Sequence, residues 1–216
     1  MHQTTSTYYK RDFWASENLK YAKPHFRMEK AARLINNIAG KKQCDLLDVG
    51  CGPAALAPLL SSNINYYGVD LAIHSRDSNL LECDFVENPI SWKGRTFDIV
   101  LAQGVFEYIG SIQAQKFAEI KSILKPGGIF ITSYVNFDHV RRVIYEPYNN
   151  VQPSESFRNG LSRHFDVKRI IPTSHHWRHR EPARPIMKRI HMHWNTRIPF
   201  LTSRLAIEYF FVCSRP

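Results

Sequence analysis

Apolar residues along the chain form short continuous runs, a pattern typical of parallel strands that are buried on both faces of a sheet. We predict strands over residues 44–49, 66–69, 97–102, 129–135, 167–174 and 205–213. Segments with helical spacing lie between several of these runs. This alternation predicts the α/β class, with a doubly wound sheet that carries helices on both faces.

Apolar residues three or four positions apart mark the predicted helices. These helices fall within residues 24–40, 111–124 and 154–165. Gly40 is the expected C-terminal cap of the first. Pro53 and Pro58 both resist a helix interior, so we expect a short helix that starts between them and holds Pro58 in its first turn. The run Pro126, Gly127 and Gly128 predicts a turn into the strand at 129–135.

The stretch LLDVGCGPA, residues 46–54, combines the end of a buried strand with two closely spaced glycines. Gly50 and Gly52 permit positive φ and a close approach of a ligand to the backbone. Open α/β sheets bind small ligands in the crevice beyond the carboxyl ends of their strands. The sequence therefore predicts a binding site at this corner.

The glycine spacing alone fits two cofactors. GCGPAA matches a relaxed dinucleotide fingerprint, with Asp70 where a ribose-binding acid would fall. Asp48 argues against a dinucleotide, because a carboxylate at that position would repel a pyrophosphate. S-adenosylmethionine (SAM) suits it better, since SAM carries a sulfonium and an ammonium and no phosphate.

Five stretches in order resemble the motifs of class I SAM-dependent methyltransferases, and more narrowly the small-molecule enzymes of the UbiE/UbiG-like type. They are LLDVGCGPA, YYGVD, ECDF, FDIVLAQGVFEYI and LKPGGIFITSY, which together span about residues 44–135. The resemblance implies a Rossmann-like sheet of seven strands. Its last strand would run antiparallel between the fifth and the sixth.

The resemblance also implies which residues bind SAM. Asp70 would accept the ribose hydroxyls, Asp84 would bind the adenine amino group, and Phe85 would pack against the adenine ring. Asp48 would act through the ligand's ammonium, and Gln103 would lie near the transferred methyl. The full implied set is Asp48, Gly50, Cys51, Gly52, Asp70, Leu71, Asp84, Phe85 and Gln103, joined by Tyr9, Trp14 and Arg27 from an N-terminal lid over residues 1–25.

The chain departs from the family pattern at two places. Residues 70–84 are too short and too polar for the usual helix between the second and third strands, so we expect a loop or a single turn. Many relatives also place Glu-His where this chain has Glu107 and Tyr108. We therefore expect Glu107 at a helix start or in a supporting role, while keeping it among the candidate bases.

The composition is that of one folded domain over residues 1–216, with 44% hydrophobic and 12% aromatic residues. No apolar run approaches the roughly 20 residues that span a bilayer, and the N-terminus lacks a signal-peptide core. We therefore expect a cytoplasmic protein. The four cysteines form no C-x-x-C pair, which disfavours a zinc ribbon or a disulfide framework.

The net charge of +10 is distributed unevenly. Residues 1–47 and 158–216 carry +5 and +9, whereas residues 48–157 carry −4. Two aromatic and arginine-rich stretches, 136–153 and 175–200, are additions to the minimal fold and are expected to build the acceptor site. Their arginines predict a small-molecule acceptor that carries negative charge.

Methyl transfer to an activated carbon depends mainly on alignment, so a general base is optional. Where the acceptor must lose a proton, the candidate catalytic residues are His139, Tyr145, His175 and Glu107. The histidines at 175, 176, 179, 191 and 193 show no ligand spacing for zinc, so no metal is expected.

Three other functions stay open on the sequence alone. A nucleic-acid methyltransferase is favoured by the basic flanks, although the chain has no recognisable binding module and AQGVFEY lacks an Asn/Asp-Pro-Pro-aromatic motif. The others are a protein that binds SAM without turnover and a nicotinamide oxidoreductase. Oligomeric state is not indicated.

Overall fold

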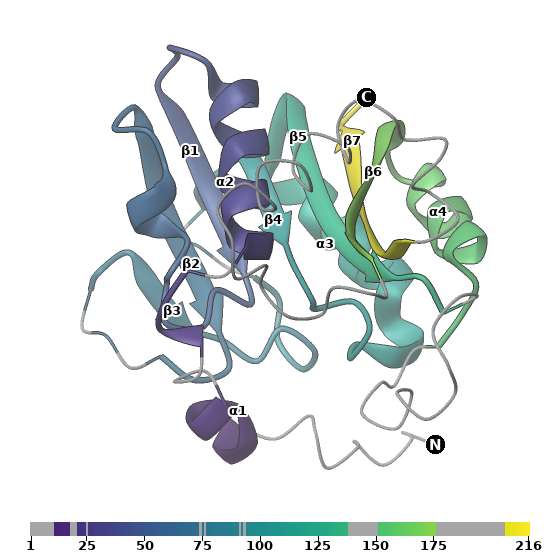
Figure 1. The fold of residues 1–216 in the computed structure, drawn as a ribbon, viewed down its shortest axis with the longest axis horizontal. Coiled ribbons are helices and arrows are strands. Elements are labelled where there is room, and N and C mark those ends of the chain that lie inside the picture. Colours follow the sequence, from purple (N-terminus) through teal and green to yellow (C-terminus); the bar gives the residue numbers. More distant parts are fainter. Residues whose placement is uncertain are drawn as a thin grey trace.

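The fold was analysed in a computed structural model of the 216-residue chain. The structure describes residues 11–17, 21–24, 26–73, 75, 77–90, 92, 94–137, 151–175 and 206–216. Within these ranges a central sheet is flanked by helices, and α1 (Arg11–Glu17) lies apart from the sheet body, beside β3 (Figure 1).

The sheet has seven strands in the order β3-β2-β1-β4-β5-β7-β6. The strands are β1 (Cys44–Val49), β2 (Ile64–Asp70), β3 (Leu80–Glu82), β4 (Phe97–Ala102), β5 (Leu124–Val135), β6 (Asp166–His175) and β7 (Ala206–Ser214). The first five run parallel, and β7 pairs antiparallel with both β5 and β6. The predicted fold class and the insertion of the last strand are therefore confirmed.

The helices cover both faces of the sheet, as predicted. They are α2 (Phe26–Ala39), α3 (Gln113–Ile123) and α4 (Ser154–Ser162). One buried cluster packs α2, through Ala31 and Ile35, on one face. The other cluster packs α3 and α4 through Phe117 and Phe157. The strand runs are apolar at nearly every position because both faces are covered.

One predicted element is confirmed and another is wrong in detail. The short helix expected to start between Pro53 and Pro58 is the 3-10 turn η2 (Ala57–Leu59), which has Pro58 at its second position. The fifth strand begins at Leu124 and not at 129, and its pairing with β4 shifts register around Gly127, which has a φ of 72°. The glycines therefore bend an existing strand and do not precede it.

The connection from β2 to β3 contains no helix among its described residues, as predicted from its length. Gly40 ends α2 with a φ of 58°, and its N–H donates to Asn36 O at 2.9 Å. A second 3-10 turn, η3 (Gly110–Ile112), leads into α3. None of the helices in the described part of the chain is long and apolar enough to cross a membrane.

Candidate functional site

The glycine corner after β1 is held against the end of β2. The N–H groups of Gly50 and Cys51 donate to Val69 O at 2.8 and 3.1 Å. Gly50 has a φ of 76° and Gly52 one of 51°, which L side chains rarely adopt. A Cβ atom on Gly50 would lie 2.6 Å from Cγ2 of Val105, so the corner packs directly on the segment that follows β4.

Asp70, at the end of β2, faces this corner. Its Oδ2 accepts the Gly52 N–H at 2.7 Å, and its Oδ1 accepts the Ala72 N–H at 3.2 Å. Because each carboxylate oxygen can accept more than one hydrogen bond, these contacts orient the group and leave it able to bind a hydroxyl. The carboxylate thus both braces the turn and faces the crevice beyond β1 and β2.

Asp48 lies within β1, and its side chain is buried, with 5% exposed. The Tyr66 hydroxyl donates to Asp48 Oδ2 at 2.8 Å. Burial raises the pKa of Asp48 from 3.8 to about 7, against the lowering effect of the Tyr66 hydrogen bond and with a small contribution from Asp70. A ligand cation placed beside Asp48 would relieve this penalty.

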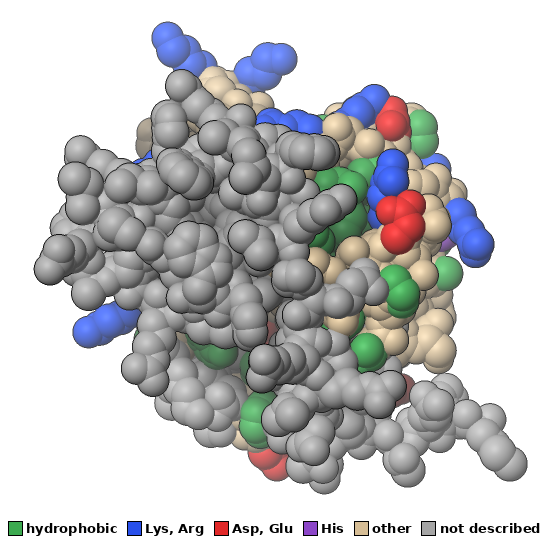
Figure 2. Space-filling model, turned by 45° about the vertical axis from the view of Figure 1, so that its right-hand side comes forward, with side chains coloured by type: hydrophobic (Ala, Val, Ile, Leu, Met, Phe, Trp, Pro, Cys, Tyr) green, Lys and Arg blue, Asp and Glu red, His purple; other side chains and the backbone are tan. Residues whose placement is uncertain are grey.

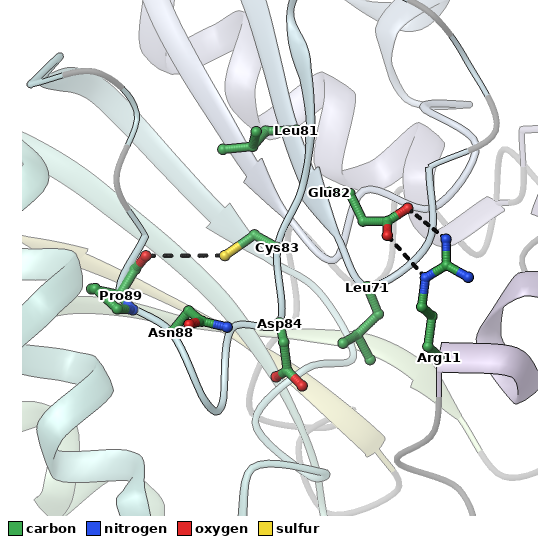
Figure 3. A pocket seen from close by; sticks show the side chains of 8 residues that line it. All are labelled: Arg11, Leu71, Leu81, Glu82, Cys83, Asp84, Asn88 and Pro89. Carbon is green, nitrogen blue, oxygen red and sulfur yellow. Dashed lines mark hydrogen bonds and ion pairs between the residues drawn. The ribbon is translucent and has the colours of Figure 1, made fainter.

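Next to Asp70 a cavity of about 370 Å³ opens between α1, the end of β2 and β3. Figure 3 shows Leu71 and Asp84 at its lower side and Leu81 at its upper side. Arg11 reaches across from α1 and forms two hydrogen bonds with the Glu82 carboxylate, at 2.9 and 3.0 Å (Figure 3). The cavity therefore combines apolar walls with acidic groups, and the Arg11 side chain that lines it is paired with Glu82.

Asp84 and Phe85 take different environments. Asp84 lines the cavity, and its Oδ1 accepts the N–H groups of Val86 and Glu87 at 2.9 and 3.2 Å. The Phe85 ring is buried in the core, with its centre 6.3 Å from that of the Phe106 ring. The predicted contact of Phe85 with adenine stays a prediction.

Buried Lys116 of α3 holds the loop that carries Asp84. Its Nζ donates to Asn88 O at 3.0 Å and to Glu119 at 2.8 Å, and it lies 4.9 Å from the centre of the Phe85 ring. Glu119 in turn accepts the Ile90 N–H. This network fixes one wall of the cavity to α3.

The remaining predicted cofactor residues lie nearby on other elements. The Trp14 ring of α1 packs edge-on against Tyr108 at 5.4 Å. Arg27 of α2 forms an ion pair with Glu208 of β7. Gln103 follows β4 and is half-buried, and Cys51 is buried with a raised thiol pKa. A reactive thiolate at Cys51 is therefore disfavoured.

A comparison with protein-family models identifies the family of the chain. Residues 24–191 match the model of a methyltransferase domain, which is well over half of the chain. The chain belongs to this methyltransferase family. None of the curated protein sequences matches the chain significantly.

Solved methyltransferase structures share its fold. A methyltransferase from Haloferax volcanii, in complex with the activator Trm112, is 18% identical, with a TM-score of 0.65 over 96% of this chain and 98% of that chain. A SAM-dependent methyltransferase from Archaeoglobus fulgidus is 19% identical, with a TM-score of 0.62 over 88% and 95%. Phosphoethanolamine N-methyltransferase 2 from Haemonchus contortus, in complex with SAM, is 16% identical, with a TM-score of 0.60 over 97% and 58%.

The methyltransferase is thus a class I SAM-dependent enzyme. Its residues fit that cofactor, because Asp48, Asp70 and Asp84 place three carboxylates around the carboxyl ends of β1, β2 and β3. Among the described residues that line the cavity, the arginine, Arg11, is paired with Glu82 and is therefore not available to a phosphate. This donor set suits a cationic, phosphate-free ligand with ribose hydroxyls.

Several predicted residues of the methyltransferase cannot be assessed. Tyr9, His139 and Tyr145 lie outside the described residues, as do most of the two predicted additions, 136–153 and 175–200. His175 ends β6, and only its backbone is described. Within the described ranges no group of three His, Cys, Asp or Glu residues is arranged to hold a metal.

Sequence reasoning missed four residues of the site. The Asp48 partner Tyr66 and the Arg11–Glu82 pair are contacts between distant segments, which periodicity does not reveal. Glu208 did leave a signal, since it is the one acid within the apolar run of β7. A charged residue at 3% exposure in such a strand has a buried partner or a function.

The titration of Asp48 makes a testable prediction for this methyltransferase. Between about pH 4 and pH 7 the folded protein holds a proton on Asp48 that the unfolded chain has released, so stability falls as pH rises through this window. Asp48→Asn should remove this loss. The unfolding free energy of Asp48→Asn should therefore exceed that of the wild type. The difference should grow by a few kcal/mol as the pH rises from about 4 to about 7, because a change of one pKa unit corresponds to about 1.4 kcal/mol.

Urea denaturation at pH 5 and pH 8 measures this margin. Tyr66→Phe is the companion variant, because it removes the hydrogen bond that lowers the Asp48 pKa. In that variant the fall in stability should extend to higher pH. An equal difference between wild type and Asp48→Asn at both pH values would show that Asp48 is ionised throughout.

Proposed function

We propose that this enzyme transfers the methyl group of SAM to a small organic acceptor. Bound SAM supplies a methyl carbon on a sulfonium, which is displaced in line by a nucleophile. The enzyme's own contribution is to hold the donor at the glycine corner, to orient the acceptor and to exclude water.

One observation carries the proposal. Beside the corner, the segment after β4 and the strands β5 and β7 carry the buried polar side chains Glu107, Ser133 and Glu208. Such an enclosed polar region suits a compact acceptor. On the face shown in Figure 2, the Lys and Arg side chains of the described residues project singly and form no continuous stripe of the kind that tracks a nucleic-acid backbone.

We further propose that the acceptor carries a negative group. The support is the sequence, because the additions 136–153 and 175–200 contain Arg141, Arg142, Arg178, Arg180 and Arg184. Phosphoethanolamine N-methyltransferase 2 shares the fold and is named for an acceptor that is both an amine and a phosphate ester. The likeness to that relative extends to the fold and does not assign the acceptor of this enzyme.

The test is methyl incorporation from labelled SAM into a metabolite panel, with tRNA and duplex DNA included. We expect small molecules to be methylated, and anionic or zwitterionic ones with a kcat/KM about tenfold or more above neutral analogues, since one charge-assisted contact contributes about 1.5–3 kcal/mol. Methylation of nucleic acid alone would refute the proposal. Equal turnover of neutral and anionic acceptors would refute its charge preference.

A further inference from the structure

A group of charged side chains lies at the end of the sheet where β5, β6 and β7 meet the segment after β4. It consists of Arg27 and Lys30 from α2, Glu107 from the segment after β4, and Glu208 from β7. Glu107 and Glu208 are 1% and 3% exposed. Two carboxyl groups are therefore buried close together, which is costly unless each is compensated.

Glu208 is fully compensated. Its carboxylate pairs with Arg27 and accepts the Thr173 hydroxyl at 2.6 Å. Lys30 donates to the carbonyl oxygen of Thr173 on the adjacent strand. Arg27 and Lys30 are thus directed to Glu208 and Thr173.

Glu107 is compensated at only one of its two oxygens. Oε1 accepts the Val135 N–H at 3.1 Å, which ties Glu107 to the end of β5. Oε2 is fully buried and has no hydrogen-bond partner among the residues that the structure describes. A buried oxygen left in this way is rare and points to a missing ligand or a functional role.

The surroundings of Glu107 favour a positively charged ligand. Burial, followed by the charge of Glu208, raises the pKa of Glu107 to about 8, and Arg27 opposes this only in part. Tyr134 of β5 also faces Glu107, and Lys30, whose pKa burial lowers to about 7, acts mainly on Glu208. An oxyanion would be repelled by both carboxylates, whereas an ammonium would relieve the repulsion.

Glu107 is also close to the methyl-donor corner along the chain. Val105, two residues earlier, is the side chain on which Gly50 packs. The Gly104 N–H donates to the Ser133 hydroxyl at 2.8 Å, which fixes this segment to β5. Glu107 therefore belongs to the segment that packs on the cofactor corner, at the edge of the sheet from which the two predicted additions depart.

We propose that Oε2 of Glu107 binds the nitrogen of an amine acceptor and takes its proton, so that the enzyme is an N-methyltransferase. The inference rests on the proposed small-molecule function and names the reacting group of that acceptor. The anionic group proposed above would belong to another part of the same molecule. Glu208, held by Arg27 and Thr173, positions Glu107 and keeps its environment negative.

The proton and electron balance is simple. The acceptor enters as R–NH3⁺ beside ionised Glu107, and one proton moves from nitrogen to Oε2. The freed nitrogen lone pair forms the new N–C bond, and the electron pair of the broken C–S bond stays on sulfur. The products are R–NH2–CH3⁺, the neutral thioether and protonated Glu107, which then releases its proton to water.

A binding experiment tests the site without turnover. The melting temperature is measured in 100 mM methylammonium chloride and in 100 mM sodium chloride, at pH 6.5 and pH 8.5. We expect methylammonium to stabilise the wild type by about 2–4 °C relative to sodium at pH 8.5, and by less at pH 6.5, where Glu107 is protonated. Identical melting temperatures in both salts at both pH values would overturn the proposal.

Glu107→Gln is the variant that isolates the carboxylate, because glutamine has the shape of the protonated acid. It should lose the difference between the two salts. Glu155→Gln, at an exposed position of α4, is the matched control and should behave as the wild type. A difference between the salts that persists in Glu107→Gln would place the ammonium elsewhere and overturn the assignment.

An activity experiment separates this inference from the proposed function. Matched acceptors that differ only in NH2 against OH, such as glycine and glycolate, are included with the wider panel. We expect the best acceptor to be an amine, and Glu107→Gln to lower its kcat/KM about 100-fold at unchanged SAM affinity. A hydroxyl or thiol as best acceptor would overturn the inference and keep the small-molecule function, whereas methylation of nucleic acid alone would overturn both.

Discussion

Gly50→Ala is expected to abolish detectable SAM binding and to lower the free energy of unfolding by about 2–5 kcal/mol, the sum of a left-handed backbone at an L residue and an overpacked contact. Gly50 has a φ of 76°, and its new Cβ would lie 2.6 Å from Cγ2 of Val105. The end of β1 cannot move freely, because the Gly50 N–H donates to Val69 O. The segment after β4 is held as well, because the Gly104 N–H donates to the Ser133 hydroxyl. Relief of the contact must therefore move the cofactor corner.

Gly40→Ala is the matched control. Gly40 also has a positive φ, of 58°, but a Cβ there would meet no atom within 4 Å. The free energy of unfolding of this variant should fall only by the cost of a left-handed backbone at an L residue, about 1–2 kcal/mol. The variant should bind SAM as the wild type does. Urea denaturation and titration calorimetry with SAM measure the two effects. Normal SAM affinity in Gly50→Ala would remove the corner from the cofactor site.

The parallel strands could be predicted closely because burial on both faces leaves a clear signal. For β1 and β4, whose neighbours cover both faces, the predicted and observed bounds agree. β5 was predicted to begin at Ile129, five residues too late, since Pro126 and the two glycines have the composition of a turn. The structure shows that a register shift lets those residues stay within the strand.

The candidate site was predictable only in part, for a similar reason. Acids that end strands, such as Asp48 and Asp70, can be found from local sequence because strand ends converge at one edge of a sheet. Their partners come from distant segments, as Tyr66 does for Asp48 and Arg11 does for Glu82. Local patterns do not encode such contacts, so the lid predicted over residues 1–25 named Trp14 of α1 and not Arg11, the α1 residue that lines the cavity.

Glu107 shows how an expectation can be changed by packing. Its sequence position favoured a helix start, yet α3 begins only at Gln113 and η3 lies between them. Glu107 bonds the backbone of β5, which fits the supporting role that was expected as the alternative to a helix start. Its buried free oxygen is a property of the tertiary structure, and it moves Glu107 to the front of the candidate bases.

Asp70→Ala should weaken binding of SAM and of its demethylated product by about 10- to 150-fold, which corresponds to about 1.5–3 kcal/mol for a charge-assisted hydrogen bond. The expected loss has two parts, because Asp70 also accepts the Gly52 and Ala72 N–H groups. Asp70→Asn separates them. The amide oxygen can still accept the Gly52 N–H, while the Ala72 N–H loses its acceptor and the charge that would bind the ribose is gone.

We therefore expect Asp70→Asn to keep most of the wild-type stability and to show most of the loss in affinity, whereas Asp70→Ala should lose both. Titration calorimetry with SAM, beside urea denaturation, measures the two quantities, and Asp166→Ala, at an exposed position of β6, controls for the loss of any acid. Wild-type affinity in Asp70→Asn with a loss in Asp70→Ala would make Asp70 a brace of the glycine turn alone. Wild-type affinity in both variants would exclude Asp70 from the site, because a carboxylate that holds the ribose cannot be removed without cost.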